Sequence, residues 1–242
     1  MRLIVIKRKY LLMALILIGL IYFVKGKYYK KERGQVTFLP ISNKVIGIDP
    51  GHGGVDPGAV GKAGIKEDKI NLQIARNLKR LIEQSGGIVI LTRNSDEGLY
   101  SEDAKTLRQM KNEDLRKRKE IIDESGSEIF ISIHLNSFTR SNYYGAQTFY
   151  RKGSVEGESL AQIIQDELRN VLDKDNKREP QQRDDVYLLN EIQVPSTLVE
   201  CGFLSNKEEE QLLDDPIYQE KIAWAIYIGI LNYFNELATV NQ

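Results

Sequence analysis

The stretch VIGIDPGHGG, residues 45–54, joins an apolar run to a glycine-rich turn and contains one of only two histidines in the chain of 242 residues. The apolar run predicts a buried strand, and the glycines with the proline predict a turn after it. His52 in this turn is a metal ligand, part of a phosphate-binding loop, or an ordinary loop residue. The phosphate-binding loop is excluded, because the Walker pattern needs glycine at Asp56 and serine or threonine at Ala63.

Strand and helix patterns alternate along the rest of the chain. The predicted strands are 45–48, 88–92, 129–134, 146–150 and 197–200, and the predicted helices are 68–84, 115–124, 159–172 and 216–234. Such alternation predicts an α/β fold with a single open, mostly parallel sheet and helices on both faces. The polar residues 100–112 have no clear period, which indicates a surface loop or lid.

Both histidines and one glutamate follow predicted strands. His52 comes just after the first strand, His134 ends the strand 129–134, and Glu200 ends the strand 197–200. Ligands of open α/β sheets bind at the carboxyl ends of the strands, so these side chains are expected at one edge. Catalytic zinc commonly takes three protein ligands, often two histidines and a glutamate. The two histidines together therefore favour a metal site.

Glu67 is a candidate for the third ligand. It lies fifteen positions past His52, across a loop with five glycines that can fold back tightly. An acid in the first turn of a helix also simply favours the helix dipole. Spacing alone leaves both interpretations of Glu67 open.

Cys201 is the only cysteine, which excludes an intramolecular disulfide and a multi-cysteine zinc site. A thiol nucleophile paired with His134 is an alternative to the metal. Side chains alternate along a strand, however, so Glu200 and Cys201 should face opposite sides of the sheet. The pattern favours Cys201 as a small buried hydrophobic residue.

The chain carries 34 basic and 34 acidic residues, and no basic stripe dominates. This balance argues against nucleic acid as a partner. The charge runs 113–120 and 207–210 are interpreted as solvated helix faces.

The N-terminus carries basic residues on both sides of the uncharged stretch 10–24. These fifteen residues suit a signal sequence and fall short of the roughly 20 that a membrane span prefers. No small-x-small cleavage pattern follows, which favours an uncleaved anchor in the membrane over a removed signal peptide. We therefore expect a signal peptide or anchor at 1–24, a linker at 25–43 and a folded catalytic domain at 44–238.

Several motifs, in order, resemble the zinc-dependent N-acetylmuramoyl-L-alanine amidases. They are IGIDPGHGGVDPGAVG, the glutamate Glu67 that opens a helix, LTRNSD, LRKR before FISIHLNS, and VPSTLVECGFLSNKEE. The resemblance runs from about residue 44 to about residue 234. Within the family, the chain looks most like the germination-specific amidases of the spore cortex.

The resemblance implies a central sheet of about six strands and one Zn²⁺ per chain held by His52, Glu67 and His134. It implies that Glu200 takes a proton from the attacking water and returns it to the departing nitrogen. Asn136 and Arg118 match family positions too, and are expected next to the reacting groups.

The resemblance further implies a substrate and a location. The enzyme would cleave the amide between N-acetylmuramic acid and L-alanine in peptidoglycan, in the spore cortex. It would act outside the cytoplasmic membrane, secreted or anchored, or in the spore envelope. An activating or targeting protein partner is a further expectation. Two alternatives stay open, namely a zinc exopeptidase acting on cell-wall peptides and a non-catalytic peptidoglycan-binding protein.

Overall fold

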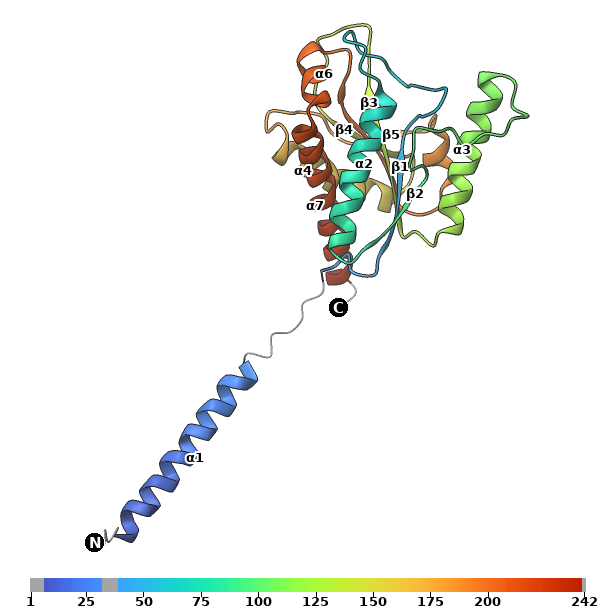
Figure 1. The fold of residues 1–242 in the computed structure, drawn as a ribbon. Coiled ribbons are helices and arrows are strands. Elements are labelled where there is room, and N and C mark those ends of the chain that lie inside the picture. Colours follow the sequence, from blue (N-terminus) through green and yellow to red (C-terminus); the bar gives the residue numbers. More distant parts are fainter. Residues whose placement is uncertain (1–6, 32–38, 241–242) are drawn as a thin grey trace, which may run out of the picture. The chain divides into compact units, whose positions relative to one another are not determined.

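The computed structural model describes residues 7–31 and 39–240, which belong to two compact units, Met1–Phe38 and Leu39–Gln242 (Figure 1). The first unit contains the helix α1 (Arg8–Lys31). No helix in the described ranges combines the length and the apolar character needed to cross a membrane. The anchor expected at residues 10–24 stays a prediction.

One mixed sheet of six strands forms the centre of the second unit, in the order β2-β1-β3-β6-β4-β5. β1 lies parallel to β2 and β3, and β3 lies parallel to β6, whereas β4 lies antiparallel to β6 and parallel to β5. The expectation of one α/β sheet of about six strands is confirmed, and most of its pairings are parallel. The strands are β1 (Val45–Pro50), β2 (Ile88–Leu91), β3 (Ile129–Asn136), β4 (Gln147–Arg151), β5 (Gln181–Arg183) and β6 (Ser196–Phe203).

Helices cover both faces of the sheet, as predicted (Figure 1). The helices α2 (Glu67–Gln84), α4 (Val155–Val171) and α7 (Pro216–Val240) pack on one face, and α3 (Leu107–Glu124) and α5 (Tyr187–Glu191) on the other. Alternating residues of β3 serve the two layers: Ile131 joins the core beneath α2, α4 and α7, and Phe130 packs against Ile122 of α3. The helix α6 (Lys207–Asp214) links β6 to α7.

The predicted loop or lid at 100–112 is wrong in its second half, because α3 already begins at Leu107. Thr106 caps this helix: its hydroxyl accepts a hydrogen bond from the Gln109 backbone N–H, and the Gln109 side chain accepts one from the Thr106 N–H. This capping box starts a helix whose first turns are too polar to show an apolar period. The short elements β5, α5 and α6 were not predicted either.

The two charge runs are only partly solvated, which corrects the sequence-based interpretation. Arg118 in the run 113–120 is 1% exposed, and Glu210 in the run 207–210 is 3% exposed. Glu210 Oε1 accepts a hydrogen bond of 2.8 Å from the Ala63 backbone N–H, in the loop that leads to Glu67. These buried charges have tertiary partners, which sequence-local charge patterns do not reveal.

Candidate metal centre and active site

The three predicted ligand residues meet at the edge where β1 and β3 end. His52 lies two residues past β1, His134 lies in β3, and Glu67 is the first residue of α2. Glu67 Oε1 lies 3.0 Å from His134 Nδ1 and 3.3 Å from His52 Nε2. One ligand atom from each residue lies within 4.8 Å of the others, so this group could hold a metal ion.

Two glycines make room for this cluster. A Cβ atom at Gly51 would lie 2.2 Å from His134 Cε1, and one at Gly58 would lie 2.6 Å from Glu67 Oε2. Both separations are far below van der Waals contact, so any larger residue would displace a candidate ligand side chain. The glycines of this loop thus allow the close approach of the histidine and glutamate side chains.

The Glu67 carboxylate is held by several donors. Oε1 accepts hydrogen bonds from the Leu135 backbone N–H at 2.9 Å and from Asn71 Nδ2 at 3.2 Å, and Oε2 accepts one from the Ala59 N–H at 2.8 Å. Burial by itself would raise the pKa of Glu67, but the hydrogen bonds and charges of His134 and His52 lower it. The carboxylate is therefore ionised and fixed in place at neutral pH.

His52 has an unusual backbone conformation, with φ at +63°, in the left-handed region that few residues other than glycine adopt. Its carbonyl oxygen accepts a hydrogen bond of 2.7 Å from Arg118 Nη2, and its ring Nδ1 lies 3.0 Å from Asp56 Oδ2. Burial opposes the charged imidazolium, but hydrogen bonds to Asp56 and Glu67 raise the pKa of His52 to about 9 in the metal-free chain. A metal ion bound at Nε2, the ring nitrogen that faces Glu67, must therefore displace a proton.

Two buried arginines, Arg93 and Arg118, hold the segment 49–52 in place through hydrogen bonds. Arg118 Nη1 donates to Asp49 Oδ1 at 2.7 Å and to the Pro50 carbonyl at 2.8 Å. Arg93 donates through Nε to the same Pro50 carbonyl and through Nη2 to the Gly51 carbonyl, at 2.8 and 2.9 Å. Charge-assisted hydrogen bonds of this kind are short and strong. They hold the strained turn that carries His52.

Asp49 balances the charge of Arg118 beneath the turn. Its two oxygens also accept hydrogen bonds from Thr92 Oγ1 at 2.6 Å and Ser132 Oγ at 2.7 Å. Burial opposes ionisation, but Arg118 and the hydrogen bond from Thr92 lower the pKa of Asp49 to about 2. Asp49 and Arg93 were not singled out from the sequence. The signal available was an acid at the end of an apolar strand, a position that requires a buried partner.

Glu200 stands beside His134, because the two residues are register partners on β6 and β3. Both strands continue past the predicted ends, to Asn136 and Phe203, with a register shift after His134. Glu200 Oε2 is buried and has no hydrogen-bond partner among the described residues. Burial raises the pKa of Glu200 to about 7, against the opposing charge of His134. This carboxyl group can therefore gain or lose a proton near neutral pH.

Cys201 faces the opposite side of the sheet, as the alternation predicted. Its side chain is fully buried in the core shared by α2, α4 and α7. Burial raises the pKa of the Cys201 thiol well above its ordinary value. A buried thiol with a raised pKa is a poor nucleophile.

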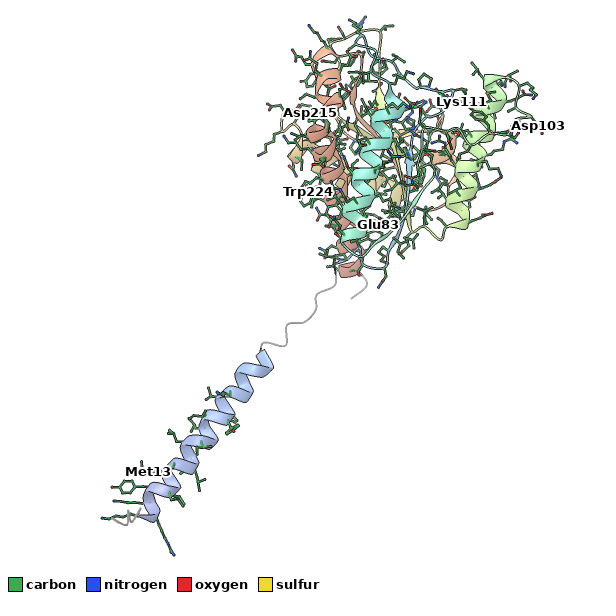
Figure 2. All side chains as sticks on the ribbon, viewed as in Figure 1. Met13, Glu83, Asp103, Lys111, Asp215 and Trp224 are labelled. Atoms are coloured by element: carbon green, nitrogen blue, oxygen red, sulfur yellow. The ribbon has the colours of Figure 1, made fainter. Side chains whose placement is uncertain are left out.

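Two hollows meet at Glu200. A cavity of about 330 Å³ contains His52, His134 and Glu200 and reaches Lys111 of α3. A groove of about 700 Å³ also has Glu200 in its lining, together with Asn136, which was expected near the reacting groups. Lys111, labelled in Figure 2, also pairs with Asp56, with 3.2 Å between Nζ and Oδ2. Asp56 and Lys111 were not predicted as part of the site.

The sequence matches a known family. The model of the N-acetylmuramoyl-L-alanine amidase family matches residues 46–232 of the chain. The chain belongs to this amidase family. The enzyme class expected from the sequence motifs is thereby confirmed.

Individual amidases of known sequence or structure agree with this assignment. The germination-specific N-acetylmuramoyl-L-alanine amidase of Bacillus subtilis is 40% identical over 95% of this chain and 96% of its own length. The CwlD amidase of Clostridioides difficile, solved in complex with the GerS lipoprotein, is 56% identical, with a TM-score of 0.78 over 80% of this chain and 99% of that one. The amidase AmiC2 of Nostoc punctiforme is 30% identical, with a TM-score of 0.68 over 79% of this chain and 97% of its own.

Proposed function

We propose that this amidase hydrolyses the bond between N-acetylmuramic acid and L-alanine in the peptidoglycan of the spore cortex, with a zinc ion held by His52, Glu67 and His134. The observation that carries the proposal is the cluster of these three side chains with a protonatable carboxyl group, Glu200, beside it. The cortex as substrate is supported by the likeness to the germination-specific amidase of Bacillus subtilis.

The donor set suits zinc. Two imidazoles and one carboxylate are a common catalytic zinc set, which leaves a position for water or substrate. Ligand atoms bound about 2 Å from one ion at tetrahedral angles lie roughly 3.3 Å apart. The distances of 3.0 and 3.3 Å from Glu67 Oε1 to the two histidine nitrogens suit such a centre. When bound, zinc supplies Lewis acidity that makes water acidic near neutral pH and polarises a carbonyl group.

Glu200 moves the proton in this proposal. Its Oε2 has no partner among the described residues, so it is available to take a proton from the attacking water. The same carboxyl group then delivers the proton to the nitrogen of the departing alanine, which makes the amine a good leaving group. A pKa of about 7 suits both halves of this exchange near neutral pH.

The remaining expectations belong to the same proposal. Residues 1–24 direct the chain out of the cytoplasm as a signal or anchor, residues 25–43 act as a linker, and residues 44–238 carry the catalysis outside the cytoplasmic membrane or in the spore envelope. A protein partner is supported by the CwlD amidase, which was solved with a lipoprotein. A reporter fused after Gln242 that is active only in the cytoplasm would refute this orientation.

Product analysis tests the reaction itself. The full-length chain is incubated with vegetative peptidoglycan and with spore cortex, and the products are analysed by mass spectrometry. An amidase releases intact stem peptides and leaves bare muramic acid, and the proposal expects this from cortex. Shortened stem peptides would establish the zinc exopeptidase alternative, and binding without any product would establish the non-catalytic alternative.

A further inference from the structure

The groove beside Glu200 contains three arginines. This arginine groove is lined by Arg140, Arg178, Arg183, Tyr143, Phe149 and Glu200. No metal-ligand residue lines it, so it extends away from the metal cluster on the Glu200 side. The groove therefore adjoins the reacting groups through Glu200 but does not include the metal cluster.

Arg140 is exposed, and the other two arginines differ in how their charge is balanced. Arg183 forms a two-pronged pair with Asp185, at 2.7 Å from Nε and 2.6 Å from Nη2. Arg178 is half-buried, and in the described part of the chain no carboxylate oxygen lies within ion-pair distance of its guanidinium. Burial lowers the pKa of Arg178, although the charge of Glu209 opposes this. Arg178 thus presents a partly desolvated positive charge to the groove.

The Arg178 guanidinium is held in position by two hydrogen bonds, and its other N–H donors are available to a ligand. Its Nε donates to the Tyr144 carbonyl at 2.7 Å, its Nη1 donates to Gln147 Oε1 at 2.8 Å, and its guanidinium lies 4.5 Å from the centre of the Phe203 ring. A guanidinium has five N–H donors, and these hydrogen bonds use two. The nearby Glu209 carboxylate is occupied by the backbone N–H groups of Gly145 and Phe203, each at 2.9 Å.

The direction of the reaction assigns the groove to one half of the substrate. Glu200 must face the nitrogen of the scissile amide in order to protonate it, and that nitrogen belongs to the peptide. The peptide therefore lies next to Glu200, and of the two cavities that Glu200 lines, the arginine groove is the one without a candidate metal ligand. Stem peptides carry free carboxylates, whereas the sugar backbone is largely neutral.

We propose that the arginine groove binds the stem peptide and that Arg178 recognises one of its carboxylates. The proposal rests on the proposed amidase function. A planar guanidinium with unused donors binds a carboxylate through paired hydrogen bonds, and partial burial strengthens the contact. Arg178 is thus a specificity-determining residue that separates charged stem peptides from amidated ones.

The test compares a muramoyl tetrapeptide with free carboxylates and the same compound with every carboxyl group amidated. We expect the full-length parent to favour the free form about tenfold in kcat/KM, through KM, which corresponds to one charge-assisted contact. Arg178→Gln should lose this preference and should hydrolyse the amidated compound as the parent does. Arg178→Lys should keep part of the preference, because it retains the charge without the planar fork.

Arg169→Gln is the matched control. Arg169 donates to the Asn176 and Arg178 carbonyls, each at 2.9 Å, so its loss disturbs the same turn and leaves the Arg178 guanidinium in the groove. This variant should keep the preference for free carboxylates. Equal use of both substrates by the parent overturns the proposal. An equal loss on both substrates in Arg178→Gln also overturns it, since a structural role or a contact with the sugar would have that effect.

Binding separates this proposal from the amidase function. The tetrapeptide alone, free or amidated, is titrated by calorimetry into the chelator-treated full-length chain. Selective binding of the free form that disappears in Arg178→Gln supports the groove even if hydrolysis is absent. Hydrolysis without selective binding or kinetic preference leaves the function standing and overturns the groove. If neither hydrolysis nor binding occurs, both proposals fall.

Discussion

Two carboxylates at one sheet edge, the buried Glu67 at the start of α2 and the half-buried Glu200 in β6, have opposite surroundings. Glu67 accepts three hydrogen bonds from Leu135, Asn71 and Ala59, and its pKa is lowered. Glu200 Oε2 has no hydrogen-bond partner in the described ranges, and burial raises the pKa of the group to about 7. The same side chain is thus held as a permanent anion in one place and left protonatable in the other.

The difference follows from the backbone around each residue. Glu67 lies where the loop before α2 and the irregular end of β3 direct backbone N–H groups at its carboxylate, from Ala59 and Leu135. Glu200 lies within a paired strand, where the backbone N–H groups are used by the sheet. A ligand benefits from a fixed charge, and a proton carrier requires a pKa near the working pH. The structure thus supplies separate environments for the two proposed roles.

The largest expected effect comes from removing one of the three proposed metal ligands, His52, Glu67 and His134. His134→Ala should lose the bound zinc, and hydrolysis should fall below detection with it, because only two of the proposed ligands remain. The fold should survive, since the surrounding core is apolar. Metal analysis by mass spectrometry and circular dichroism measure the two properties on the same sample. A variant that is free of metal and fully active would end the zinc proposal.

Glu200→Gln tests the proposed role of Glu200 as the proton carrier. The amide has the shape of the carboxyl group but cannot carry the proton, so hydrolysis should slow by ~10²–10⁴-fold. Zinc content and muropeptide binding should equal those of the parent. Loss of zinc in this variant would make Glu200 a ligand and require another role for Glu67. A nearly parental rate would refute the proposed proton transfer.

Asp49→Asn tests the buried Asp49–Arg118 pair, which supports the turn that carries His52. The folded pKa of about 2 lies below the ordinary 3.8, so the Asp49 charge stabilises the fold above about pH 4, and this stabilisation is lost as the pH falls towards 2. The shift corresponds to about 2 kcal/mol of unfolding free energy at neutral pH. Urea unfolding of parent and variant in chelator should show the largest difference above pH 4 and a shrinking one below it. A difference independent of pH would contradict this role.

The smallest effect is expected at Cys201, the neighbour of Glu200 on the other face of β6. Cys201→Ser should hydrolyse at the parental rate per folded chain, and a thiol-alkylating reagent should do little, because the thiol is fully buried. A chelator should abolish hydrolysis of both proteins. An inactive Cys201→Ser that folds and binds zinc would instead favour the thiol nucleophile. Rates, metal content and thermal unfolding are measured side by side.

The sequence alone determined which residues to consider at the metal centre. Two histidines and two glutamates follow or precede predicted elements, and the glycines between them mark a tight loop, so local patterns were enough to nominate them. The alternation of strands and helices likewise predicted the α/β class. The opposite orientation of Glu200 and Cys201 followed from the two-residue period of a strand.

Only the tertiary structure decided how these residues are supported. The Asp49–Arg118 pair spans 69 positions and the hydrogen bond from Ala63 to Glu210 spans 147, and no local pattern encodes such pairings. The antiparallel direction of β4 could not be predicted from the sequence either, because the period of hydrophobic residues is the same in parallel and antiparallel strands. Side-chain period and turn chemistry are local properties of the chain, whereas charge balance and pKa depend on which distant groups the fold brings into contact.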